Sequence, residues 1–259
     1  MSETPVPAAT VLLLRDAPAF EVLMICRHES SSFAGGALVF PGGRVDKGDY
    51  DLAWVNLADG LSSEPRMAAS QIAAIREAFE ETGVLIARDA AGAMIAGARA
   101  IALSDRRAGV QRDDAAFLDL MRREELRLAC DQLLLFSHWI APPGLHKRFD
   151  TLFFAARFPK GQSVLEDGDE ATEALWISPT AALSARASGA RKIIFPTARN
   201  LDLLAASSST EQAFAFAKSR PIRAVMPEIA TRDGKAFLTI PDGLGYPVTE
   251  EPIETATRF

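Results

Sequence analysis

Residues 76–84 read Arg76-Glu77-Ala78-Phe79-Glu80-Glu81-Thr82-Gly83-Val84. At about 100° per residue, a helix would place Glu77, Glu80 and Glu81 within an arc of about 100° on one face. Like charges at these spacings repel one another and destabilise an isolated helix by about 0.2–0.5 kcal/mol per pair. A hard divalent cation, which binds several oxygen ligands, would turn this repulsion into binding. The segment therefore predicts either a solvated acidic face or a carboxylate site for a cation, with Arg76 placed to orient one carboxylate.

The same segment ends a helix that we expect to span 67–82. Ile72, Ile75 and Phe79 fall on the side opposite the glutamates, which predicts that this side faces the core. Gly83 follows the last helical residue, where a left-handed cap favours glycine. The pattern thus predicts a helix with one buried face and one acidic face.

The rest of the chain mixes strands and helices. Apolar, β-branched runs predict strands at 11–15, 20–27, 133–140, 151–158 and 174–178, and residues 37–40 lead to a break at Pro41-Gly42-Gly43. A second helix is expected within 113–134, with Leu126 and Leu128 among its apolar positions, and a third after the Ser178-Pro179 pair. Further helical stretches lie near 196–218, and a tail rich in Pro and Gly begins at Pro241. Because the elements do not alternate regularly, we predict an α+β fold with a mixed sheet.

Composition excludes several classes of function. The chain has 259 residues, with 28 Lys and Arg against 34 Asp and Glu and a formal charge of −6. This acidic balance argues against broad nucleic-acid binding, which requires a basic surface. Two cysteines exclude a disulfide framework and a Cys-rich zinc site, and three histidines argue against a His-rich metal site. Any metal ion would therefore be held by carboxylates.

The sequence also argues against a membrane protein. The longest window without Asp, Glu, Lys or Arg runs from Gln132 to His146, shorter than the roughly 20 residues a membrane helix needs. The first five residues lack the basic start of a signal peptide. We expect a cytoplasmic protein with no membrane and no nucleic-acid partner. The sequence leaves open whether it is a monomer or a homodimer.

Together with Phe40-Pro41-Gly42-Gly43 upstream, residues 76–84 resemble the Nudix box, Gly-x5-Glu-x7-Arg-Glu-U-x-Glu-Glu-x-Gly-U, in which U is a bulky apolar residue. The matching positions are Arg76, Glu77, Glu80, Glu81, Gly83 and Val84. The resemblance implies the α+β Nudix fold, a mixed β-sheet sandwiched between helices. It further implies one Nudix hydrolase domain over 1–259, with cap insertions at about 44–66 and 88–130 and a C-terminal extension at about 205–259.

The box is interrupted in this chain. Arg76 stands 33 positions after Gly43 where the pattern requires 14, an insertion of 19 residues. Counting forward from Gly43 reaches Asp49, and counting back from Arg76 reaches Ala68. The first glutamate of the box is thus either replaced by Asp49 or absent. In the family that residue mainly braces a loop, so the change leaves metal binding in place.

The insertion, together with residues 138–142 and 147–151, is similar to the motif-19 type of coenzyme A diphosphatase-like Nudix proteins. A signature of coenzyme A-cleaving relatives matches here at Leu23, Arg27, Gly36 and the run 40–43. It departs most at Ser32, which stands where the signature has a second arginine. That departure favours an ADP-ribose or dinucleotide pyrophosphatase, whereas the insertion and Arg27 favour coenzyme A.

The resemblance implies Mg²⁺- or Mn²⁺-dependent hydrolysis of a diphosphate linkage in a small nucleoside diphosphate derivative. Coenzyme A or acyl-CoA would give 3′,5′-ADP and (acyl-)phosphopantetheine. A non-catalytic Nudix domain that binds a nucleotide and regulates a partner is the alternative of another class. The residues implied in catalysis and metal binding are Arg76, Glu77, Glu80, Glu81 and Glu170. Glu173 competes with Glu170 for its role, and Glu77 and Glu170 are both candidates for the base.

Substrate-binding residues are expected around the glycine turn and after the Pro142-Pro143-Gly144 turn. Arg27, Gly42 and Gly43 would hold the diphosphate. Lys147 and Arg148 would bind a further phosphate, such as the 3′-phosphate of coenzyme A, or would be a basic pair in an exposed turn.

Overall fold

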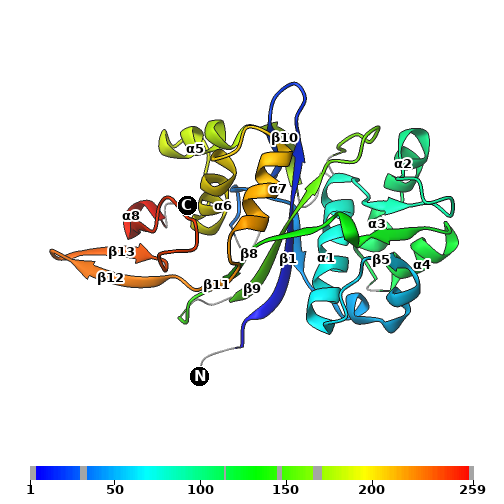
Figure 1. Ribbon diagram of the computed structural model, residues 1–259, viewed down its shortest axis with the longest axis horizontal. Helices are drawn as coiled ribbons and strands as arrows, with labels where there is room; N and C mark the ends of the chain where they lie inside the picture. The colour runs from blue at the N-terminus through cyan, green and yellow to red at the C-terminus, as the bar shows by residue number, and fades with distance from the viewer. Residues whose placement is uncertain (1–3, 30–33, 114, 145–147, 166–170, 257–259) are drawn as a thin grey trace.

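The computed structural model describes residues 4–29, 34–113, 115–144, 148–165 and 171–256 (Figure 1). Its centre is an eight-stranded sheet in which six strands follow the order β10-β2-β1-β9-β8-β11, while β3 pairs with β2 and β4 with β1. The strands are β1 (Val6–Arg15), β2 (Glu21–Arg27), β3 (Leu38–Val39), β4 (Gly42–Arg44), β8 (Leu134–Ile140), β9 (Phe149–Arg157), β10 (Ala171–Ile177) and β11 (Ala224–Val225). Strand β1 pairs antiparallel with β2 and parallel with β9. The sheet is therefore mixed, as the sequence predicts.

Strand β1 separates two hydrophobic cores because its side chains alternate between the two faces of the sheet. Val11 and Leu13 pack in the core that contains helix α1. Leu12 and Leu14 pack in the core that contains helix α6. In Figure 1, α1 and the helices beyond it lie on one side of β1, and α5 to α8 lie on the other. This arrangement confirms the expected sheet between helical layers.

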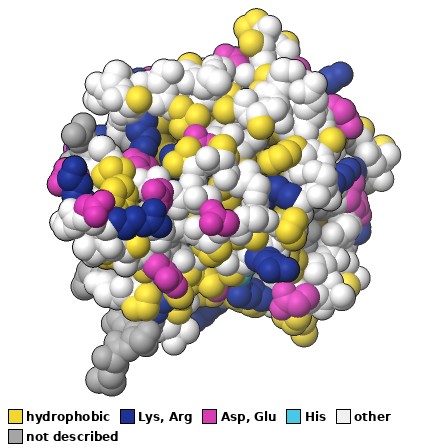
Figure 2. Space-filling view, turned by 60° about the vertical axis from the view of Figure 1, so that its left-hand side comes forward, with side chains coloured by type: hydrophobic (Ala, Val, Ile, Leu, Met, Phe, Trp, Pro, Cys, Tyr) yellow, Lys and Arg dark blue, Asp and Glu magenta, His cyan; other side chains and the backbone are white. Residues whose placement is uncertain are grey.

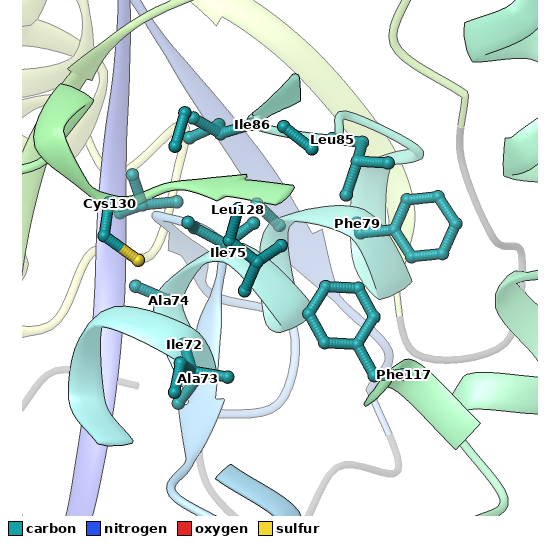
Figure 3. Close-up of a cluster of buried hydrophobic side chains, with 14 of the residues drawn as sticks. Ile72, Ala73, Ala74, Ile75, Phe79, Leu85, Ile86, Phe117, Leu128 and Cys130 are labelled. Carbon is teal, nitrogen blue, oxygen red and sulfur yellow. The ribbon is translucent and has the colours of Figure 1, made fainter. Parts of the chain in front are cut away.

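Helix α1 (Pro65–Thr82) begins two residues earlier than the sequence predicts. The side chain of Glu64 accepts hydrogen bonds from the backbone N–H groups of Arg66 and Met67, and proline suits the first helical position. The helix ends at Gly83, whose φ of 72° is the left-handed conformation that favours glycine. Ile72, Ile75 and Phe79 are buried in the core as expected, as Figure 3 shows.

The two segments expected as caps take different places. The short helices η1 (Lys47–Tyr50) and η2 (Leu52–Asn56) follow β4, and η1 contacts the acidic face of α1. Segment 88–130 instead packs behind α1, where the ring of Phe117 stacks on Phe79 with centroids 6.1 Å apart (Figure 3). The expectation that 88–130 folds over the carboxylates is therefore wrong, because its apolar side chains join the core on the opposite face of the helix.

Segment 88–130 also contains less helix than expected. It holds α2 (Gly97–Ser104), α3 (Arg107–Val110) and α4 (Ala116–Arg123), followed by β7 (Arg127–Ala129) and η3 (Cys130–Gln132). The predicted helix within 113–134 ends at Arg123, since Glu125 has a φ of +52°. Strand β7 pairs with β5 (Ala58–Asp59) and β6 (Ala87–Arg88). Leu126 and Leu128 are therefore buried from a loop and a strand rather than from a helix.

The C-terminal part covers the other face of the sheet. Helix α5 (Pro179–Ala187) begins at the predicted Ser178 cap and is followed by α6 (Phe195–Ala205) and α7 (Thr210–Ser219). A hairpin of β12 (Glu228–Arg232) and β13 (Lys235–Thr239) follows, with β14 (Glu250–Pro252) and α8 (Ile253–Ala256). These elements are not predicted from the sequence. The hairpin turns at Asp233 and Gly234, whose positive φ angles of 51° and 75° are typical of Asp-Gly turns. Within the described residues, no helix is long and apolar enough to cross a membrane.

Candidate active site

The glycine turn before β4 lies directly against the acidic face of α1. The backbone N–H of Gly42 donates to Oε2 of Glu81 at 2.8 Å. A Cβ atom at Gly43 would lie 2.4 Å from Oε1 of Glu77, and one at Gly42 would lie 2.5 Å from Oγ1 of Thr10. Neither position has room for a side chain. The two glycines let the turn approach the glutamates closely enough to form one site with them.

Arg76 is the buried centre of this site. Its Nη1 donates to Oε1 of Glu77 at 2.9 Å and to Oε1 of Glu80 at 3.0 Å. Its Nε and Nη2 bind the two carboxylate oxygens of Asp49, each at 3.0 Å, and Nη2 also donates to the carbonyl of Arg44 at 2.8 Å. Arg76 therefore orients two of the predicted carboxylates, one more than the sequence indicates.

Asp49 fills the place of the missing first glutamate of the box. The structure brings Asp49, and not Ala68, to Arg76, and the side chain of Asp49 is 2% exposed. Its Oδ2 also accepts the backbone N–H of Asp46 at 2.8 Å, so one carboxylate joins the inserted loop to α1. Because the planar guanidinium binds a carboxylate through two parallel hydrogen bonds, the loop is held in a defined position. The structure therefore supports the role of a loop brace.

Burial and crowding govern the ionisation of these groups. Burial raises the pKa of Glu77 to about 8, an effect that Arg76 opposes and Glu80 reinforces. Burial alone would lower the pKa of Arg76, but Glu77, Asp49 and Glu80 outweigh it and raise that pKa, so the guanidinium stays charged. Burial also raises the pKa of Asp49, against the opposing effect of Arg76. The site thus holds three buried carboxyl groups around one central cation.

This excess of hard oxygen donors suits a divalent cation. Glu77 and Glu81 lie against the glycine turn, and Glu80, on the same helix, shares Arg76 with Glu77. Among the described residues no cluster of three acidic, His or Cys side chains is arranged as a finished metal shell. One oxygen each of Glu77 and Glu80 accepts a hydrogen bond from Arg76, and one oxygen of Glu81 accepts a hydrogen bond from the N–H of Gly42. The donor set fits a metal ion that would replace part of these bonds.

The raised pKa of Glu77 predicts how stability depends on pH in the metal-free protein. Between its ordinary value of 4.5 and about 8, folded Glu77 holds a proton that the unfolded chain releases. Each pH unit in this range therefore lowers the free energy of unfolding by up to about 1.4 kcal/mol. In EDTA, we expect the Tm of Glu77→Gln to exceed that of the wild type by a margin that grows from pH 5 to pH 8. A margin independent of pH would contradict this ionisation.

The other predicted site residues lie in different environments. Nη1 of Arg27 lies 3.9 Å from Oε1 of Glu81, and its buried Nε finds no hydrogen-bond partner among the residues described. Arg148 immediately precedes β9, and its Nε donates to the carbonyl of Ala141 at 3.0 Å. Lys147 and Glu170 lie outside the described residues, as does Ser32. Of the two predicted substrate-binding arginines that the structure describes, Arg27 and Arg148, Arg27 is the one that lies close to the carboxylates of α1.

Glu173, the competing candidate for the role of Glu170, is engaged elsewhere. Its two carboxylate oxygens accept hydrogen bonds from Nη1 and Nη2 of Arg191 at 2.7 and 3.0 Å. The register nevertheless pairs Ala171, the residue after Glu170, with Arg27. Strand β10 therefore starts beside the cation that contacts Glu81.

A cavity of about 920 Å³ opens beside the glycine turn and had no signal in the motifs of the sequence. Arg27 and Gly42, which both contact Glu81, belong to its lining. Apolar side chains from β1, β8, β9 and the C-terminal extension form most of the rest. Asp233-Gly234 is the feature that could have located the hairpin forming part of this wall.

Comparison with known proteins agrees with this geometry. The family model described as the NUDT19 Nudix domain matches residues 58–201, more than half of the chain. The chain belongs to this Nudix family. The match includes Arg76 and the three glutamates of α1, while Arg27 and the glycine turn precede it. Nudix hydrolases use divalent metal ions in general, which accords with the donor set described above.

Individual Nudix relatives are moderately similar to this chain. The acyl-coenzyme A diphosphatase NUDT19 of Xenopus laevis is 25% identical over 283 residues, which cover 92% of this chain and 74% of that protein. The human protein of the same name is 28% identical, over 64% of this chain and 55% of its own length. The chain thus spans about three quarters of the frog relative and about half of the human one. A crystal structure of a Nudix hydrolase from Alicyclobacillus acidocaldarius superposes with a TM-score of 0.72 at 26% identity, covering 83% of this chain and 97% of that one.

Proposed function

We propose that this protein is a diphosphatase that hydrolyses coenzyme A or acyl-CoA to 3′,5′-ADP and (acyl-)phosphopantetheine. The observation that carries the proposal is the contact of Glu77 and Glu81 with the Gly42-Gly43 turn, together with Arg76, which binds both Glu77 and Glu80. The names of the frog and human relatives support the choice of substrate. The apolar cavity beside Arg27 supports it further, because a pantetheine arm or acyl chain needs an apolar surface next to the diphosphate.

The metal ions would be Mg²⁺ or Mn²⁺, held by Glu77, Glu80 and Glu81 and by Glu170. When bound, such ions neutralise diphosphate oxygens and lower the pKa of a water molecule. The protein itself positions the groups. Arg76 fixes one oxygen each of Glu77 and Glu80, and the Gly42 N–H fixes Glu81.

The reaction adds the water oxygen to one phosphorus and breaks its bond to the bridging oxygen. Glu77 is our candidate to accept the proton of the water, because its carboxylate lies against the glycine turn beside Glu81. Glu170 is the other candidate for this role. The buried Nε–H of Arg27, which has no hydrogen-bond partner among the described residues, would donate to a phosphate oxygen of the substrate.

Arg27→Gln tests the phosphate contact. A hydrogen bond to a charged group contributes about 1.5–3 kcal/mol, so we expect kcat/KM for coenzyme A to fall by about 10- to 150-fold. Arg157→Gln is the control, because Arg157 is half-exposed and pairs with the exposed Glu211. Equal kinetics for both variants would exclude Arg27 from substrate binding.

The substrate is tested by chromatography of the products from coenzyme A, acetyl-CoA, ADP-ribose and NADH, each with Mg²⁺, Mn²⁺ or EDTA. We expect metal-dependent 3′,5′-ADP from the two coenzyme A substrates. If AMP forms from ADP-ribose or NADH and the coenzyme A substrates are not cleaved, the protein is a diphosphatase with a different substrate. Ser32, which departs from the coenzyme A signature, favours that alternative. Calorimetric binding of a nucleotide without turnover would instead indicate a regulatory domain, against which the retained glutamates argue.

A further inference from the structure

The apolar cavity is larger than the diphosphate chemistry requires. Its volume of about 920 Å³ is near the upper end for small-molecule sites. Of the described residues that line it, two carry a charge, Arg27 and Glu228. The phosphates of a substrate would lie at the carboxylates, so this apolar space is available to another part of the same molecule.

Part of the cavity wall comes from outside the matched Nudix domain. Met226, Ile229, Leu238 and Ile253 line the cavity, and all four follow residue 201, where the family match ends. Met226 and Ile229 are apolar yet 39% and 66% exposed. Figure 2 shows apolar side chains among charged ones on the side of the molecule that carries the hairpin. Exposed apolar side chains that line a cavity are typical of a ligand site.

The extension that supplies this wall is held to the rest of the fold by buried polar bonds. Glu251 of β14 accepts from Arg186 of α5 at 2.8 Å and lies 3.7 Å from Arg199 of α6. Trp139, which also lines the cavity, donates from Nε1 to the hydroxyl of Tyr246 at 3.1 Å. The wall is therefore a fixed part of the structure, which a length-selective site requires.

The cavity joins the carboxylate site through two of its lining residues. Gly42 donates to Glu81, and Arg27 lies 3.9 Å from the same carboxylate. A substrate whose diphosphate contacts Arg27 would thus lead its pantetheine arm into the cavity, with its acyl chain at the end of that arm. Free coenzyme A has no apolar end long enough to fill such a volume, whereas an acylated coenzyme A has one.

We propose that the cavity receives the acyl chain of an acyl-CoA substrate, and that Met226 and Ile229 of the C-terminal extension set the chain length it accepts. This inference rests on the proposed diphosphatase function. Each methylene buried there would improve binding by about fourfold. The enzyme would therefore favour medium and long acyl chains over free coenzyme A and acetyl-CoA.

Ile229→Glu tests the proposal, because it places a charge in the wall that would contact the acyl chain. The fold should tolerate this charge, because the position is exposed. We expect the ratio of kcat/KM for palmitoyl-CoA to that for free coenzyme A to fall at least about tenfold. Met226→Glu should act in the same direction, and Ile229→Val should stay within about fourfold of the wild type. Val55→Glu is the matched control, because Val55 is also 66% exposed and does not line the cavity.

A second measurement does not depend on the reaction. Titration of the metal-free protein in EDTA with 11-(dansylamino)undecanoic acid should show saturable binding, weakened at least about tenfold by Ile229→Glu and unaffected by Val55→Glu. Unchanged chain selectivity and unchanged probe binding in both Glu variants would overturn the proposal. An equal loss for free coenzyme A and palmitoyl-CoA would also overturn it, because the cavity would then hold the pantetheine arm. If the wild type cleaves no coenzyme A substrate, the proposed function fails, and the titration still decides whether the cavity binds an acyl chain.

Discussion

Replacement of Glu80 by glutamine should lower kcat for coenzyme A hydrolysis by about 10³-fold while the protein stays folded. Glutamine keeps the size of the side chain and can still accept the hydrogen bond from Nη1 of Arg76, but it removes the charge. The fold should persist, because Arg76 retains its bonds to Asp49 and Glu77. Turnover with Mg²⁺ and Tm in EDTA measure the two effects separately.

A binding readout accompanies the loss of turnover. A ligand that binds only the folded state at 100 times its Kd stabilises it by about 2.7 kcal/mol, so Mg²⁺ should raise the Tm of the wild type. This rise should shrink in Glu80→Gln and persist in the control Glu125→Gln, whose carboxylate is exposed on the segment behind α1. If Glu80→Gln kept full activity with Mg²⁺, Glu80 would not be a metal ligand.

Arg76→Met should produce the largest loss of stability of any single change at the site. Removing one member of a buried ion pair costs about 3–5 kcal/mol, since the partner charges stay buried without compensation. Here Asp49, Glu77 and Glu80 would all lose their shared cation. Urea unfolding at pH 7 in EDTA measures the difference, and a loss below about 1 kcal/mol would contradict the central role of Arg76.

A double variant separates the loss of Arg76 from general damage to the core. Asp49→Asn with Arg76→Met should recover part of the stability lost in Arg76→Met alone, because it removes a buried carboxylate that no longer has a partner. Lowering the pH toward 5 should recover more, because burial already raises the pKa of Asp49 and, without the opposing effect of Arg76, Asp49 takes up a proton. Additive losses in the double variant would mean that the two residues do not act as a pair.

The helix and its acidic face could be predicted because their signals are local. The spacing of Glu77, Glu80 and Glu81, the apolar positions opposite them and the glycine at 83 all follow from the period of one helix. The hairpin of β1 and β2 and the cap at Ser178 are equally local. The prediction that the helix continues after Arg123 was wrong. Leu126 and Leu128 keep an apolar pattern, but the backbone turns at Glu125.

Contacts between segments that are distant in the sequence could not be predicted from the spacing of residues. Counting left Asp49 and Ala68 as alternatives for one position, and the choice depends on how the inserted loop folds back to Arg76. The cavity is assembled from strands of the sheet and a hairpin some 200 residues away in the chain. Burial, which raises the pKa of Glu77, is likewise a property of the packed site and not of the helix alone.

The most direct test of the proposed diphosphatase activity measures, in one reaction, whether the diphosphate is cleaved and whether the thioester is retained. Octanoyl-CoA is incubated with Mg²⁺ and either the wild type or Glu80→Gln, and the products are quantified by chromatography and ³¹P NMR. We expect 3′,5′-ADP and octanoyl-phosphopantetheine in equal amounts from the wild type, with the thioester intact, and almost no product from Glu80→Gln. Free octanoate with intact coenzyme A, or equal turnover by both proteins, would contradict this expectation.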